Sequence, residues 1–250
     1  MCRLMWMLAI VLTACGNAIT PDAPAALRPA SVIPGNTSTV EPYVGLRTDM
    51  VKYQIQNRGI TDLAILDAMN AVPRHEFVPG EWLPQAYEDH PLPIGYGQTI
   101  SQPYIVALMT EQLKLKRGDK VLEIGAGSGY QAAVVAQLGM EVYSVEIIPE
   151  LARAADERLE RLGFKVAVLQ GDGYLGWQEH APYDAIIVTA APDHVPQPLV
   201  KQLKDGGRLV IPVGPQGSYQ TLWQFTRQGD ELKAVNLGDV MFVPLVGGKP

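Results

Sequence analysis

The chain has 250 residues, which is enough for one sizeable α/β domain with a short extra segment. Its hydrophobic content of 47% and charged content of 18% exclude a largely disordered chain. The net charge of −6 disfavours a general nucleic-acid binder, because such a protein needs basic surface to displace phosphate counterions.

The first predicted element is a signal peptide at residues 1–14. Arg3 is followed by an apolar run of about eleven residues, from Leu4 to Ala14, whereas a membrane-spanning helix needs roughly twenty. The residues before Cys15 read Leu-Thr-Ala, which resembles a bacterial lipobox. We therefore expect Cys15 to be acylated and the protein to be held in the cell envelope or periplasm by that lipid anchor alone. The alternative is an ordinary secretory signal in which Cys15 has no role.

A tether and two helices are predicted next. Residues 15–42 are rich in Pro, Ala, Ser and Thr and lack periodicity, which predicts a linker ahead of a folded domain at residues 43–250. Thr61 followed by DLAILDAMNAV indicates a capped helix that ends before Pro73. Apolar residues at helical spacing predict a second helix over residues 105–115.

Alternating strands and helices follow. Short runs rich in Val, Ile and Leu stand at 120–125, 141–147, 166–172, 184–190 and 208–214, with helical segments at 130–139 and 149–162 between the first three. The tail alternates polar and apolar residues on both sides of a Gln-Gly-Asp turn, as antiparallel strands do. This order predicts a Rossmann-like α/β fold, a doubly wound and mostly parallel sheet with antiparallel C-terminal strands.

A glycine-rich turn joins the first of these strands to its helix. VLEIGAGSGY places Gly125, Gly127 and Gly129 where a tight backbone turn and free helix N–H groups can receive a ligand. A dinucleotide fingerprint reads GxGxxG, but here the third glycine comes one residue early, which disfavours a dehydrogenase. Together with Glu123, the pattern resembles the first motif of class I S-adenosylmethionine-dependent methyltransferases. The resemblance implies that these residues and Ala126 bind the methyl donor; a purely structural turn is the alternative.

Two further carboxylates follow predicted strands. Glu146 ends the second strand, where a carboxylate can accept hydrogen bonds from both ribose hydroxyls. Asp172 and its neighbour Gly173 end the third strand, where the carboxylate can accept from an adenine amino group. Either acid alone could be a surface residue. Open α/β sheets bind ligands at the carboxyl ends of their strands, so the two acids and the glycine turn together predict one donor site.

The uncharged stretch GYGQTISQPYIV, at residues 95–106, precedes the glycine turn and lies within the block that carries the most specific resemblance. PLPIGYGQTISQPYIVALMTEQL, at residues 91–113, is similar to the signature of protein-L-isoaspartate O-methyltransferases. Further blocks resemble that family in the same order, among them VPRHEFVP, GDGYLGW and FVPLVGG, so that the resemblance runs from about Tyr43 to the C-terminus. The first forty residues depart from the pattern of the usual family member. Because members of the family are usually cytoplasmic, the cytoplasm is the alternative to the envelope location.

The resemblance implies roles for three residues of this segment. It assigns Ser101 to orienting the substrate carboxylate, with Thr99 and Ile100 lining the donor. A carboxyl group has a pKa of about 4 and is already ionised at neutral pH, so the reaction needs no general base. A neutral hydroxyl can therefore orient the nucleophile without weakening it. The alternative for Ser101 is a helix N-cap ahead of Pro103.

The resemblance implies an enzyme that transfers a methyl group from S-adenosyl-L-methionine to the α-carboxylate of L-isoaspartyl residues in damaged proteins, initiating their repair. D-aspartyl residues are a further candidate substrate. A class I methyltransferase acting on a small molecule and a non-catalytic envelope lipoprotein that keeps the fold are the alternatives. We expect no metal, since the four histidines are scattered and no CxxC occurs. A monomer without a nucleic-acid partner is expected.

Overall fold

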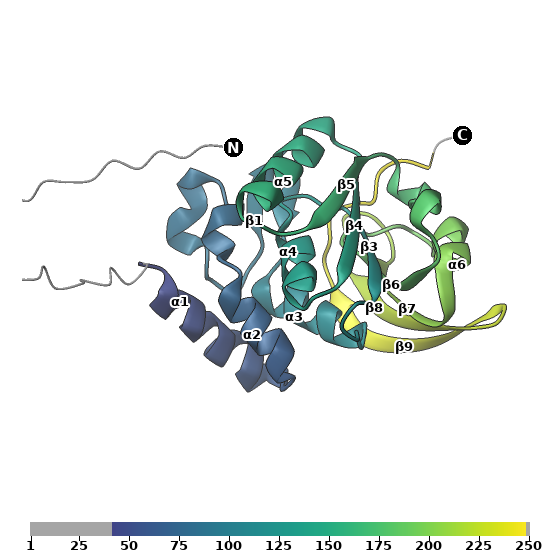
Figure 1. The fold of residues 1–250 in the computed structure, drawn as a ribbon, viewed down its shortest axis with the longest axis horizontal. Coiled ribbons are helices and arrows are strands. Elements are labelled where there is room, and N and C mark those ends of the chain that lie inside the picture. Colours follow the sequence, from purple (N-terminus) through teal and green to yellow (C-terminus); the bar gives the residue numbers. More distant parts are fainter. Residues whose placement is uncertain (1–41, 249–250) are drawn as a thin grey trace, which may run out of the picture. The chain divides into compact units, whose positions relative to one another are not determined.

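A seven-stranded sheet with the order β5-β4-β3-β6-β7-β8-β9 forms the centre of the fold (Figure 1). The computed structural model describes residues 42–248, so that the predicted signal peptide and the tether up to residue 41 lie outside the described residues. No helix within residues 42–248 is both long and apolar enough to cross a membrane.

The sheet has the predicted mixture of strand directions. Its strands are β3 (Lys120–Ile124), β4 (Glu141–Glu146), β5 (Val166–Gln170), β6 (Tyr183–Val188), β7 (Leu203–Val213), β8 (Gln220–Gln228) and β9 (Glu231–Val240). The first five run parallel, and β8 and β9 are antiparallel to their neighbours. A separate two-stranded hairpin is formed by β1 (Leu92–Gly95) and β2 (Gln98–Ile100). The prediction of a doubly wound, mostly parallel sheet is confirmed.

One strand boundary is wrong in the sequence prediction. Strand β7 begins at Leu203 rather than at residue 208, because the chain passes through Gly206 without leaving the sheet. Gly206 has a φ of +74°, and the register with β6 shifts between Tyr183 and Ala185. The glycine thus marks an irregularity inside the strand.

The helices cover both faces of the sheet. They are α1 (Val44–Asp49), α2 (Leu63–Ala71), α3 (Pro103–Gln112), α4 (Tyr130–Gln137), α5 (Pro149–Arg161) and α6 (Gln197–Gln202). A π-helical segment, Met50–Ile55, continues α1, and short 3₁₀ turns lie at Gln56–Arg58, Arg74–Phe77, Gly80–Gln85, Gly173–Leu175 and Gln178–His180. Figure 1 shows α4 and α6 on opposite sides of the sheet.

Two helix starts differ from their predictions. The N-cap of α2 is Asp62, whose Oδ1 accepts hydrogen bonds from the N–H groups of Ala64 and Ile65, so Thr61 lies one residue outside the cap. Helix α3 begins at Pro103, two residues before its apolar periodicity indicates, because proline suits a first turn whose N–H has no intrahelical partner.

The core consists of two clusters, because successive side chains of a strand point to opposite faces of the sheet. Val121 and Ile187 pack into a buried cluster with residues of α2, α3 and α4, whereas their neighbours Leu122 and Ile186 pack on the other face with Leu199 of α6. Central parallel strands are therefore buried on both faces, which explains their continuous apolar runs. This arrangement brings the carboxyl ends of β3, β4 and β6 to one edge of the sheet.

Candidate functional site

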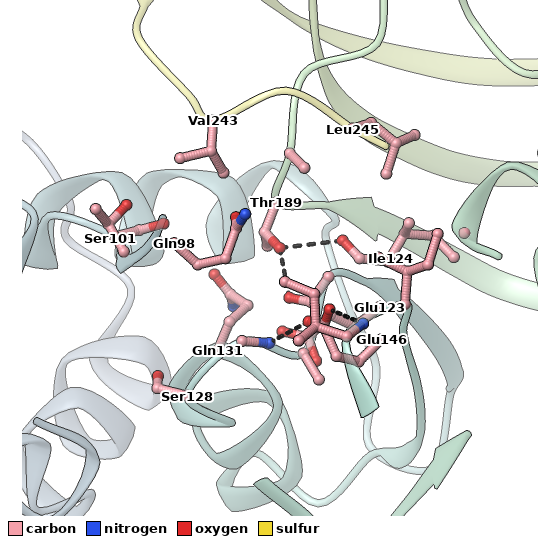
Figure 2. A pocket seen from close by; sticks show the side chains of 18 of the residues that line it. Gln98, Ser101, Glu123, Ile124, Ser128, Gln131, Glu146, Thr189, Val243 and Leu245 are labelled. Atoms are coloured by element: carbon pink, nitrogen blue, oxygen red, sulfur yellow. Dashed lines mark hydrogen bonds between the residues drawn. The ribbon is translucent and has the colours of Figure 1, made fainter. Parts of the chain in front are cut away.

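A pocket lies at that edge, where β3, β4 and β6 end. Its floor is the glycine turn after β3; its walls are the segment 98–101, the end of β4 and the tail residues 243–246 (Figure 2). We call it the central pocket. Ligands bind at this end of open α/β sheets because the loops there diverge and leave space between them.

The glycine turn is shaped by contacts that exclude side chains. Gly125 has a φ of +96°, and a Cβ there would lie 2.6 Å from Oγ1 of Thr189. That hydroxyl donates to the carbonyl oxygens of Ile124 and Gly125, at 3.0 and 2.7 Å. Gly125 donates in turn to the carbonyl of Val145 on β4, at 2.8 Å. Only glycine fits this close approach of three chain segments.

Glu146 is held in place by the turn. It is 6% exposed, and its two carboxylate oxygens accept hydrogen bonds from the N–H groups of Gly127, at 2.8 Å, and Ile148, at 3.0 Å. These two bonds fix the carboxylate at the end of β4 and leave further lone pairs directed at the pocket. The geometry suits an acceptor for a pair of hydroxyl groups.

Glu123 lines the same pocket in a different environment. It is 1% exposed, accepts a hydrogen bond from the hydroxyl of Ser144, and its other oxygen has no partner among the described residues. Burial raises the pKa of Glu123 to about 8, against the lowering effect of the Ser144 hydrogen bond. None of the described residues that line the pocket is Lys, Arg or His. The pocket therefore presents the Glu146 carboxylate and a Glu123 carboxyl that is mostly protonated at pH 7, with no cationic side chain among the described lining residues, which favours a positively charged ligand.

Most of the predicted donor-binding residues come together here. Those that line the pocket are Thr99, Ile100, Glu123, Gly125, Ala126, Gly127, Glu146 and Gly173, and the predicted catalytic residue, Ser101, lines it as well. Gly129 does not line it: with a φ of +86° it is the N-cap of α4, and a Cβ there would approach Leu159 of α5 at 3.2 Å. Its contribution in the structure is to the packing of the turn against α5.

Asp172 is placed beside the pocket rather than in its lining. Its Oδ1 accepts a hydrogen bond from the N–H of Tyr174, at 2.9 Å, and caps a 3₁₀ turn, while its Oδ2 accepts from the N–H of Gly248, at 2.7 Å. The carboxylate thereby holds the C-terminal tail. The adenine contact expected of Asp172 stays a prediction.

The segment that carries Ser101 is braced from outside the pocket. Strand β2 pairs with β1, and Nε2 of Gln102 donates to the backbone carbonyl of Asp89, at 3.0 Å. The Asp89 carboxylate pairs in turn with Arg58, at 2.8 Å. Helix α3 has Gln102 as its N-cap, without a side-chain capping bond, so Ser101 is not the cap. Its half-buried hydroxyl lies across the pocket from Glu123 and Glu146 (Figure 2).

Sequence reasoning missed several lining residues. Thr189 follows β6, Gln131 lies on α4, and Val243 and Leu245 belong to the tail. Gln131 is anchored by a 2.8 Å hydrogen bond from its Nε2 to Oγ1 of Thr110 on α3. The tail block FVPLVGG was visible as a resemblance, but nothing local indicated that it folds back onto the glycine turn.

Other candidates lie away from the pocket. The imidazole of His194, a residue next to the expected site, is 66% exposed, pairs with Asp193 and does not line the pocket. Within residues 42–248, no cluster of three His, Cys, Asp or Glu side chains is placed to hold a metal ion.

Comparison with known families matches this chain over residues 46–250. The matching family is described as protein-L-isoaspartate(D-aspartate) O-methyltransferase. A protein-L-isoaspartate O-methyltransferase of Picosynechococcus sp. is 55% identical over 86% of this chain and 96% of its own length. One from Gloeobacter violaceus is 54% identical over 80% of this chain and 98% of its own length.

Solved structures agree with these sequence relatives. A structure named protein-L-isoaspartate O-methyltransferase superposes with a TM-score of 0.74 at 33% identity, over 80% of this chain and 66% of that chain. A beta-aspartate methyltransferase from Plasmodium falciparum, in complex with S-adenosyl-L-homocysteine, superposes with a TM-score of 0.70 at 26% identity, over 80% of this chain and 98% of that chain.

Proposed function

The chain belongs to the protein-L-isoaspartate(D-aspartate) O-methyltransferase family, and from this premise we propose how its residues perform the methyl transfer. The enzyme uses S-adenosyl-L-methionine to methylate the α-carboxylate of L-isoaspartyl residues in damaged proteins. The resulting ester closes to a succinimide, which returns some of these residues to normal aspartate. D-aspartyl residues are the proposed second substrate.

The central pocket fits the methyl donor in shape and charge. The turn at Gly125–Gly127 lets the backbone approach the ligand closely, and Glu146 is fixed as an acceptor for the ribose hydroxyls. When bound, the donor supplies an electrophilic methyl group on a positively charged sulfur. The absence of Lys, Arg and His from the described lining residues avoids repulsion of that charge.

Ser101 positions the nucleophile. The observation that carries this proposal is the uncharged Thr99–Ser101 segment lying directly across the pocket from two carboxylates. A hydroxyl donor can hold one oxygen of the substrate carboxylate while the other oxygen attacks the methyl group. A lysine or arginine at this place would bind the carboxylate more tightly but would reduce its nucleophilicity. Such positioning contributes several kcal/mol, and about 7–11 in ideal intramolecular systems.

The tail covers the donor side of the pocket with apolar groups. Val243 and Leu245 face the glycine turn across the pocket, and Leu245 is 7% exposed (Figure 2). Backbone hydrogen bonds from Ala191 to Val243 and from Leu245 to Ala191, at 2.8 and 2.9 Å, attach the tail to the end of β6. We expect this cover to keep water from the reacting carboxylate and the sulfonium group.

The proposed function is tested by a methyl-transfer assay on an isoaspartyl peptide beside its normal aspartyl twin. Labelled methyl ester should form on the isoaspartyl peptide alone, because only that isomer presents a free α-carboxylate on an extended backbone. Equal labelling of both peptides, or of neither, would contradict it.

The cellular location is a separate proposal. The lipobox-like Leu-Thr-Ala-Cys sequence ending at Cys15 supports export and lipid anchoring in the envelope, with residues 15–42 as the tether. A cytoplasmic location is the alternative. We further propose that the enzyme acts as a monomer.

A further inference from the structure

A second depression adjoins the central pocket on the far side of Ser101. Helix α3 forms one wall, through Tyr104 and Leu108 among others, and the end of β9 with the segment after it forms the other. We call it the flank groove. It shares three residues with the central pocket, Thr99, Ser101 and Thr189, so that the two spaces meet at the proposed position of the substrate carboxylate.

Large apolar side chains stand exposed along the flank groove. Tyr219, in the turn between β7 and β8, is 69% exposed, and Met241, just after β9, is 65% exposed. Neither belongs to a buried cluster or packs against one, whereas Tyr104 and Leu237 in the same groove pack against the core. The fold therefore makes no use of the apolar surfaces of Tyr219 and Met241, and exposed apolar surface beside a functional site favours a binding role.

The charges of the flank groove disfavour an acidic occupant. The guanidinium of Arg58 stacks on the ring of Tyr104 at 3.5 Å and pairs with Asp89, so its charge is already balanced. Asp239 adds a carboxylate to the other wall. An acidic side chain in the groove would meet that carboxylate without a free cation to offset it.

We propose that the flank groove binds the polypeptide on either side of the isoaspartyl residue, and that Tyr219 and Met241 select substrates with an apolar neighbouring side chain. This specificity rests on the proposed placement of the substrate carboxylate at Ser101. The groove is continuous with that position, so an extended peptide whose carboxylate reaches Ser101 can continue over it. An apolar neighbouring side chain strengthens substrate binding, because it leaves water to pack on the exposed faces of Tyr219 and Met241. An acidic neighbouring side chain is repelled by the carboxylate of Asp239. The enzyme thus favours damage sites that unfolding exposes from apolar surroundings.

The test compares isoaspartyl hexapeptides that differ only in the residues flanking the isoaspartyl position, which are Leu, Ser or Glu. For the unaltered enzyme, kcat/KM for the Leu-flanked peptide should exceed that for the Ser-flanked peptide by on the order of tenfold, chiefly through KM. In the double variant Tyr219→Ala/Met241→Ala the ratio should fall towards one. Leu63→Ala is the matched control, since Leu63 is 71% exposed on α2, outside the groove, and should keep the full ratio.

A charge variant tests the same groove independently of the apolar pair. Asp239→Asn should raise kcat/KM for the Glu-flanked peptide relative to the Ser-flanked one by about twofold to fivefold, with the gain shrinking at high salt. Equal rates for Leu- and Ser-flanked peptides in the unaltered enzyme, or a ratio that survives the double variant, would overturn the proposal. Those outcomes are distinct from failure of the enzyme on every isoaspartyl peptide, which would overturn the activity itself.

Discussion

Glu123 and Glu146 line the same pocket, but they differ in hydrogen bonding. Both carboxylate oxygens of Glu146 accept a hydrogen bond, whereas one oxygen of Glu123 has no partner among the described residues. The donors to Glu146 are two backbone N–H groups, whereas Glu123 accepts from the hydroxyl of Ser144. Both side chains are less than a tenth exposed. The two acids therefore differ in their hydrogen-bonded surroundings, and substitutions should separate their roles.

Substitution of Glu123 should change how stability depends on pH. Burial raises the pKa of Glu123 from 4.5 to about 8 in the folded chain, so the unfolded chain releases this proton first. The free energy of unfolding should therefore fall as pH rises from about 4.5 to 8, relative to the Glu123→Gln variant, which cannot ionise. Urea titrations of both proteins at pH 5 and pH 8 measure this. If the free energies of unfolding of the two proteins differ by the same amount at pH 5 and at pH 8, Glu123 has an ordinary pKa.

Substitution of Glu146 should weaken donor binding. Glu146→Ala removes the acceptor proposed for the ribose hydroxyls and should cost about 1–3 kcal/mol of affinity, as expected for lost hydrogen bonds to a charged group. Calorimetric titration with S-adenosyl-L-homocysteine measures the affinity without turnover. The exposed acid Glu150→Ala, at the start of α5, serves as control. Unchanged affinity in Glu146→Ala would remove Glu146 from the ribose role.

Substitution of Ser101 should slow the chemical step. Ser101→Ala removes the hydroxyl that orients the carboxylate, and a loss of roughly 10²-fold in turnover matches one misplaced oriented group. Fold and donor affinity should stay close to normal, because Ser101 caps no helix. Ser101→Thr should restore part of the rate if the added methyl fits. Single-turnover methylation of an isoaspartyl peptide by the three proteins decides this, and full activity in the alanine variant would leave Ser101 with a structural role only.

Substitution of Gly125 should destabilise the glycine turn. Gly125→Ala places a Cβ 2.6 Å from Oγ1 of Thr189 and requires an L-residue at a φ of +96°, which together should cost about 1–3 kcal/mol. The double variant Gly125→Ala/Thr189→Ala relieves the contact but not the backbone strain. It should therefore show less than the sum of the two single losses in thermal unfolding. If the two single losses of stability add up to the loss in the double variant, the turn of Gly125→Ala has moved away from Thr189.

Substitution of Cys15 tests the proposed anchor. Cys15→Ser should shift the protein from the membrane fraction to the soluble fraction, because the thiol that would carry the lipid is lost. Cys2→Ser is the matched control and should leave the membrane association in place. A natural protein that is already soluble and begins at Met1 would count against export, and would favour the cytoplasmic location.

The features that could be predicted from the sequence are those whose physical cause lies within a few residues. The glycines of the 125–129 turn, the acids at strand ends and the apolar runs of β3–β6 follow from local backbone and burial preferences. Most of the predicted donor-binding residues accordingly line one pocket, and their binding of the donor stays a prediction. The early start of β7 was not predicted, because residues 204–207 (Lys-Asp-Gly-Gly) precede the apolar run that marks the strand.

Contacts between segments far apart in the chain became known from the three-dimensional structure. Thr189 reaches Gly125 across 64 residues, and Gly248 bonds Asp172 across 76. Nothing in the neighbouring sequence indicates either contact. Both form because the strand order places the end of β6 beside β3 and the tail returns to the pocket. The flank groove has the same origin: Tyr219 and Met241 come to Ser101 through the antiparallel strands β8 and β9. The types of side chain in the sequence indicated the chemistry of this protein, and the strand order of the sheet determines which of these side chains come into contact.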